Sequence, residues 1–111
     1  MTNQTFTAIN PADCTGSSSY LGRILISYDD LVATFGTPLP GDGRKTEAEW
    51  LLRFEDGTIA AIYNYKTGKS WSPDGLPVEQ ITEWHIGGQI KAAARLVLEV
   101  LGEKAEIIDL L

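Results

Sequence analysis

His85 is the residue of this sequence best suited to acid–base chemistry near neutral pH, because an imidazole gains and loses its proton in that range. It is the only histidine, and residues 84–88 around it read WHIGG. A small hydrolase or transferase built on this chain would use it. No serine or cysteine stands beside it in a recognisable nucleophile motif, so we favour a structural histidine that hydrogen-bonds a backbone carbonyl at a strand end. We therefore assign no catalytic residue and expect no enzymatic activity.

Gly87 and Gly88 form the second chemical feature, since two glycines before a helix can present backbone amides to an anion or a phosphate. Arg44 or Lys45 and an aromatic platform such as Trp71 would complete a nucleotide pocket. The dinucleotide fingerprint and the P-loop lysine are both absent, so a tight strand-to-helix turn is the simpler interpretation. Trp71 lies in a loop, where it either folds back over the core or anchors a partner.

The remaining reactive residue types do not form a site. Cys14 is the only cysteine, so an internal disulfide and a zinc cluster are not expected. The acidic residues are not spaced as in a glycosidase or a calcium loop, and we expect no metal and no cofactor. A Cys14–His85 nucleophile–base pair is the one alternative, although Cys14 lies in the least regular part of the sequence.

The composition indicates one globular domain: the chain has 111 residues, of which 43% are hydrophobic and 22% charged. Its net charge of −6 disfavours direct binding to nucleic acid. The same charge suits docking on a basic protein surface, or simply keeps a small domain soluble. No signal peptide and no membrane-spanning run is recognisable, and a reducing cytoplasm is the expected location.

A β-hairpin over residues 49–65 is the strongest structural signal, because two apolar runs flank Asp56-Gly57. A two-residue turn there would pair Phe54 with Ile59 and Trp50 with Tyr63. The expected core face then contains Trp50, Leu52, Phe54, Ile59, Ala61 and Tyr63. The other face would carry an apolar pair among polar neighbours, and we predict a contact surface there, made by Leu51, Arg53 and Ile62.

The other elements complete an α+β domain. Residues 1–22 are expected to form an irregular N-terminal arm, and residues 23–111 a single domain. A short helix over 27–36 is predicted from the Ser27 N-cap and the Gly36 stop, followed by a strand over 81–86 and a helix over 89–101. The apolar tail 107–111 would add an edge strand or meet a second subunit, which makes a homodimer a weaker prediction. The expected fold is a two-layer sandwich: a small antiparallel sheet, the hairpin plus one or two strands, packed on one face by two helices.

Three segments together resemble a group of small proteins encoded by bacteriophages. Residues 28–38 read YDDLVATFGTP, residues 45–66 read KTEAEWLLRFEDGTIAAIYNYK, and residues 82–88 read TEWHIGG. The resemblance covers about residues 22–101, and its most specific parts are FEDGT in the hairpin and WHIGG after it. It implies no catalytic residues. It does imply a context, because small acidic phage proteins often act on host machinery by stoichiometric binding.

The function expected from these observations is that of a non-enzymatic inhibitor of a host defence system, such as an anti-CRISPR protein, which occludes a host protein in the host cytoplasm. Its expected contact residues are Arg44, Lys45, Leu51, Arg53, Ile62, Trp71, His85, Gly87 and Gly88. A sponge for nucleotide second messengers is the first alternative, and a small hydrolase that uses His85 is the second.

Overall fold

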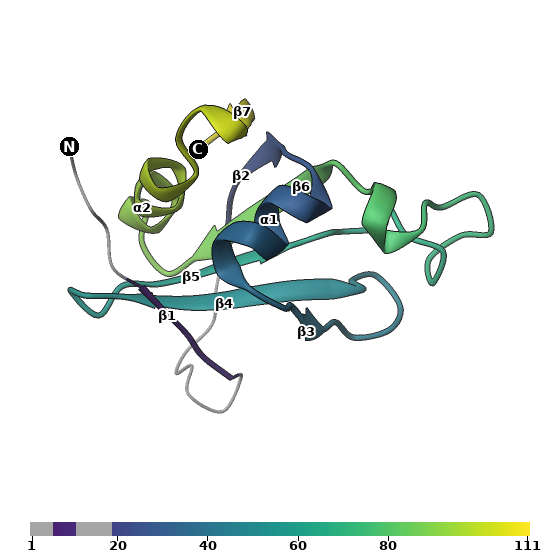
Figure 1. The fold of residues 1–111 in the computed structure, drawn as a ribbon, viewed down its shortest axis with the longest axis horizontal. Helices are drawn as coiled ribbons and strands as arrows, with labels where there is room; N and C mark the ends of the chain where they lie inside the picture. The colour runs from purple at the N-terminus through teal and green to yellow at the C-terminus, as the bar shows by residue number, and fades with distance from the viewer. Residues whose placement is uncertain (1–5, 11–18) are drawn as a thin grey trace.

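The computed structural model describes residues 6–10 and 19–111, which form a mixed α+β structure (Figure 1). Its strands and helices follow one another as β1 (Phe6–Ala8), β2 (Ser19–Leu25), α1 (Tyr28–Phe35), β3 (Leu39–Pro40), β4 (Ala48–Phe54), β5 (Ile59–Tyr63), β6 (Glu83–Gly88), α2 (Ala92–Leu101) and β7 (Glu106–Leu110). Two short 3-10 helices, Val78–Gln80 and Gly102–Lys104, precede β6 and β7. The expected α+β class is confirmed.

The seven strands form one antiparallel sheet in the order β1-β4-β5-β6-β2-β7, with β3 also paired to β4. This sheet is larger than the small sheet that the sequence predicted. The additional strands come from both ends of the chain. β1 and β3 pair with opposite ends of β4, while β7 pairs with β2 at the far edge.

The predicted register of the β4–β5 hairpin is wrong by one residue. Arg53 lies opposite Ile59 and Trp50 opposite Ile62, so the loop contains three residues instead of two. The Gly57 N–H donates to the Phe54 carbonyl (2.9 Å), and Gly57 has a φ of +89°. This is a turn followed by a left-handed glycine, the usual geometry of a three-residue hairpin loop. A shift of one residue reverses the faces of β5, because side chains alternate along a strand.

The main core follows from the observed register. Trp50, Leu52 and Phe54 share it with Ala60 and Ile62, and not with the predicted side chains of β5. The same cluster includes residues of the other central strands and of both helices: Ile24, Trp84, Ile86, Leu31, Phe35, Ala93, Ala94, Val97 and Leu101. The predicted core residues Ile59, Ala61 and Tyr63 instead belong to a second, smaller cluster around Ile9 and Leu51.

Two described stretches of the N-terminal part, which we expected to be an irregular arm, form strands. Phe6 begins β1 and packs edge-on against Phe35, with 5.1 Å between ring centroids. Residues 19–22, placed in the arm by the sequence, form the first half of β2. Cys14 lies outside the described residues.

The two helices lie near their predicted positions. The Ser27 hydroxyl caps α1 by accepting from the Asp30 N–H (3.0 Å), and Gly36 ends the helix with a φ of +90°. α2 begins three residues later than expected, since β6 continues through Gly88 and a turn over residues 89–91 separates the strand from the helix. No helix in the described ranges 6–10 and 19–111 is long and apolar enough to cross a membrane.

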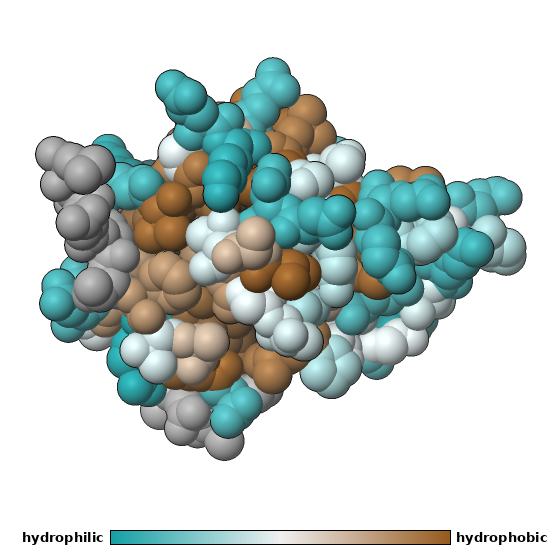
Figure 2. Space-filling view, viewed as in Figure 1, coloured by the Kyte–Doolittle hydropathy of each residue, from teal (hydrophilic) through white to brown (hydrophobic). Residues whose placement is uncertain are grey.

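Surface hydropathy is uneven on the face shown in Figure 2. Hydrophobic side chains gather over the middle and left of that view, while the extended end at right, formed by residues 66–76, is mostly hydrophilic. Several large apolar side chains at the β7 edge are well exposed: Ile107, Ile108, Leu110 and Leu111.

Candidate functional site

One line of side chains crosses five strands on the face of the sheet opposite the main core. The strand registers place Glu49 opposite Tyr63, Tyr63 opposite His85, His85 opposite Arg23 and Arg23 opposite Asp109. We call these five residues the cross-strand row. They bring two carboxylates, a phenol, an imidazole and a guanidinium onto one surface from segments that lie far apart in the sequence.

Alternation along the strands explains why the row lies on this face. Trp84 and Ile86 are fully buried in the main core, so His85 between them points to the other side. Ile24 is likewise buried, which turns Arg23 away from the core. Tyr63 joins the row because the three-residue turn sets the register of β5.

His85 sits among three tyrosine rings. Its ring centroid lies 5.1 Å from that of Tyr20 and 5.5 Å from those of Tyr63 and Tyr65. Burial by these neighbours lowers the pKa of His85, against opposing contributions from the Glu83 and Asp109 carboxylates. The imidazole is therefore neutral at pH 7, and acts on this surface as a flat, polar ring.

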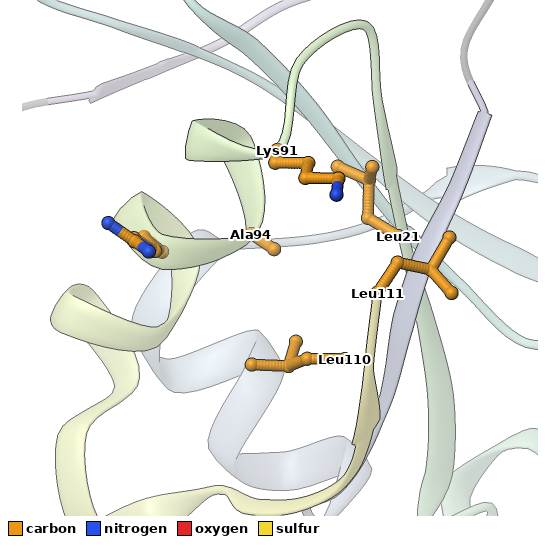
Figure 3. A pocket seen from close by; sticks show the side chains of 6 residues that line it. Leu21, Lys91, Ala94, Leu110 and Leu111 are labelled. Atoms are coloured by element: carbon orange, nitrogen blue, oxygen red, sulfur yellow. The ribbon is translucent and has the colours of Figure 1, made fainter.

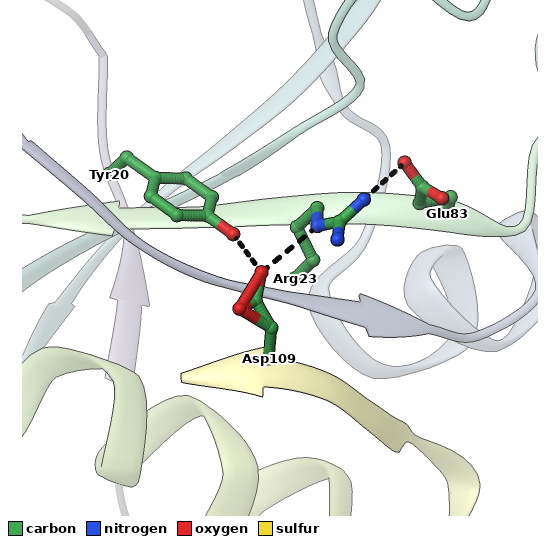
Figure 4. Close-up of polar contacts among 4 residues, drawn as sticks. All are labelled: Tyr20, Arg23, Glu83 and Asp109. Atoms are coloured by element: carbon green, nitrogen blue, oxygen red, sulfur yellow. Dashed lines mark hydrogen bonds and ion pairs between the residues drawn. The ribbon is translucent and has the colours of Figure 1, made fainter. Parts of the chain in front are cut away.

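Asp109 connects the last strand to the rest of the row (Figure 4). Its carboxylate accepts from the Tyr20 hydroxyl (2.6 Å) and from the Arg23 Nε (3.1 Å). Arg23 also pairs with Glu83 at 3.5 Å. The bonds from Tyr20 and then from Arg23 hold the pKa of Asp109 below its usual value, so this carboxyl is ionised at neutral pH.

Glu49 at the other end of the row lies in a different environment. Burial, followed by the neighbouring Asp42 carboxylate, raises its pKa, and neither ion pair made by Arg23 involves it. Burial and then Glu49 raise the pKa of Tyr63. The row thus ends in one carboxylate that is paired with a cation and one that has no ion-pair partner in the described part of the chain.

An aromatic segment over residues 65–71 adjoins the row through the contact of Tyr65 with His85. The Lys66 Nζ lies 5.1 Å from the centroid of Tyr65 and 4.8 Å from that of Trp71, so the ammonium group bridges two aromatic faces. Tyr65 is 38% exposed and Trp71 40%. Trp71 is therefore neither folded into the core nor isolated: it is an accessible ring fixed by a cation.

The loop that carries Arg44 and Lys45 lies next to this segment. The Lys45 carbonyl accepts from the Lys66 N–H (2.8 Å), and the Asp42 carboxylate accepts from the backbone N–H groups of Arg44, Lys45 and Thr46. The structure thus places the loop with Arg44 and Lys45, and Trp71, beside the row, and His85 in the row itself.

The other predicted contact residues lie elsewhere. Ile62 is fully buried in the main core, which corrects its predicted place on a contact surface, and Leu51 is 8% exposed in the second cluster. Arg53 is exposed on β4, opposite Ile59. Gly87 and Gly88 are buried in β6 and paired with β5 and β2, so the predicted strand-to-helix anion site is not formed.

Sequence reasoning missed most of the row. Arg23, Glu49, Tyr63 and Asp109 come from separate strands, and no local motif connects all of them. Among these residues only Glu49 and Tyr63 belong to the hairpin that the sequence singled out, and the wrong register placed Tyr63 in the core.

Two small hollows lie apart from the centre of the row. One, of about 120 Å³, is lined by Leu21, Lys91, Ala94, Arg95, Leu110 and Leu111 between α2 and β7 (Figure 3). The other, of about 100 Å³, is lined by Ala8, Ile9, Asn10, Thr37, Leu39, Glu49, Trp50 and Leu51. The second therefore reaches the Glu49 end of the row.

A scan against protein-family models matched no family, and comparisons with curated proteins and with solved structures found no match. Within the described residues, no group of three or more metal-ligating side chains is close enough to hold an ion. What the row offers chemically is a set of flat aromatic and charged groups suited to contact with another molecule.

Proposed function

We propose that this chain is a non-enzymatic protein that binds another protein through the cross-strand row and the adjoining segment from Tyr65 to Trp71. The observation that carries the proposal is the cluster of three tyrosines and Arg23 around His85. Tyrosine, tryptophan and arginine are the residues most enriched at the energetic centres of protein interfaces. The premise of the proposal is that the two helices cover the main-core face of the sheet, which leaves the opposite face available to a partner.

The partner we propose is a host protein, and the effect is occlusion of its surface, as in an inhibitor of a host defence system. The support for this class is the resemblance of residues 22–101 to small phage proteins, together with the net charge of −6. The nucleotide-sponge alternative is weaker, because Gly87 and Gly88 lie inside the sheet. The hydrolase alternative is weaker because the rings around His85 belong to tyrosines, and the Tyr20 hydroxyl is bound to Asp109.

Affinity capture from host lysate tests the proposal when it is combined with matched variants. Tyr65→Ala with Trp71→Ala removes two exposed rings from the binding segment, and we expect the captured protein to be lost. Ile90→Ala truncates a side chain that is 54% exposed in the turn before α2, and it should retain the captured protein. Equal capture by both variants, with unchanged melting temperatures, would contradict the proposal.

A further inference from the structure

The hollow beside Glu49 lies at the edge of the sheet, between β1 and β3. β1 pairs with β4 at residues 52–54 and the Ile9 N–H donates to the Leu51 carbonyl (3.0 Å), while β3 pairs with β4 at residues 48–49, so the hollow lies where these two edge segments end. The walls of the hollow come from Ile9, Leu39 and Leu51, which belong to the second apolar cluster. At about 100 Å³ it has room for a side chain of several atoms, since a single water needs only about 10–15 Å³.

The carboxylate at the edge of this hollow favours a cationic occupant. Glu49 lines it and is half-buried, and the neighbouring charge that raises the pKa of its carboxyl belongs to another carboxylate, that of Asp42. Taking a carboxylate out of water without a cation costs free energy, and a cationic group placed beside it recovers that cost. An apolar wall with a carboxylate at its edge matches a long side chain that has an aliphatic stem and a charged head.

From this geometry we infer that the hollow receives a lysine or arginine side chain of the bound protein, whose charged head pairs with Glu49. The inference rests on the proposed function and specifies the chemistry of the partner at one end of the row. Tyr63 lies beside Glu49 in the row, so its ring is available to the same cation. A basic partner surface also agrees with the net charge of the chain.

The test uses N-acetyl-lysine methylamide and N-acetyl-arginine methylamide as probes of the full chain, followed by amide chemical shifts. We expect shifts concentrated at Ile9, Leu39 and Glu49, and their loss in Glu49→Gln. The matched control Glu103→Gln removes an exposed carboxylate from the turn after α2 and should leave the shifts intact. The norleucine analogue, which has the stem without the charge, should bind at least about tenfold more weakly.

Shifts spread evenly over the acidic residues of the surface, or shifts that persist in Glu49→Gln, would overturn the inference. A second measurement separates it from the proposed function: the Kd of the captured partner. Glu49→Gln should raise that Kd at least about tenfold, as loss of a buried interfacial charge pair does. If capture depends on Tyr65 and Trp71 but the Kd is unchanged in Glu49→Gln, the binding function stands and this inference fails.

Discussion

Replacing Asn64 by alanine tests how the end of the hairpin that holds the binding segment is stabilised. Asn64 is fully buried, and it is the only buried polar or charged residue among those that the structure describes. Its Oδ1 accepts from the backbone N–H groups of Glu47 (2.8 Å) and Ala48 (3.1 Å). Its Nδ2 donates to the Thr67 Oγ1 at 3.3 Å. One amide therefore joins the start of β4 to the chain that leaves β5.

The expected cost follows from the donors that the substitution leaves behind. A buried donor without an acceptor costs about 1–3 kcal/mol. Asn64→Ala removes the acceptor of two such donors, the backbone N–H groups of Glu47 and Ala48. Allowing for partial rescue by water, we expect the free energy of unfolding to fall by about 2–4 kcal/mol. That is a large share of the roughly 5–15 kcal/mol typical of a domain. At about 4 °C per kcal/mol, the melting temperature should fall by about 8–16 °C.

Urea denaturation followed by circular dichroism measures this loss directly. The Thr67→Val control removes only the acceptor of the Nδ2 group, and it should cost no more than about 1.5 kcal/mol. The two variants together separate the bonds to the backbone of β4 from the bond to Thr67. A loss below about 1 kcal/mol for Asn64→Ala, with an unchanged denaturant slope, would refute the assigned role of the amide.

Three further predictions concern the core, the row and the sheet edge. In Gly88→Ala the new Cβ would lie 2.7 Å from the Ala93 Cβ, so we expect the free energy of unfolding to fall by about 1–3 kcal/mol, and a neutral result in urea denaturation would contradict this packing. The lowered pKa of Asp109 means that its contribution to stability is present above the unfolded value of 3.8 and is lost as pH falls through the folded value. Asp109→Asn should accordingly lower the melting temperature at pH 7, and the melting temperature of the variant should fall less than that of the parent protein below about pH 4. Parallel plots of melting temperature against pH for the two proteins would count against the hydrogen bonds assigned to Asp109. Because β7 is an edge strand with exposed apolar side chains, light scattering should give twice the chain mass of 12.1 kDa, reduced to one chain mass by Ile108→Lys; a monomeric parent protein excludes this dimer.

Elements governed by local signals were predictable from the sequence. The helix α1 has its N-cap serine and its terminal glycine within ten residues, and both act there as expected. The strand over 81–86 is likewise expected from its own residues, and β6 contains residues 83–86 of it. In each case the information lies within one segment, so no knowledge of a distant partner is needed.

Elements that depend on distant partners were not predictable in the same way. The first half of β2 contains a serine and a glycine, and it is paired with β6 from Ser19 onward, whereas β7 pairs with β2 only from Gly22 onward. β1 is three residues long and is held through Phe6, whose partner Phe35 lies in a helix. The cross-strand row needs the register of four strand pairs at once, which no single segment specifies. Of the row, the sequence could therefore identify His85 alone as chemically notable.

The hairpin turn is a local signal with a distant consequence, because it decides which face of β5 carries Tyr63. Asp-Gly is compatible with both two-residue and three-residue loops, and the left-handed Gly57 here closes the longer one. With the shorter loop, Tyr63 would enter the core opposite Trp50, and Ile62 would take its place beside His85. The row would then lose its phenol next to Glu49, and the core would lose a fully buried isoleucine. The binding face proposed for this chain thus depends on a single turn residue that lies well away from it.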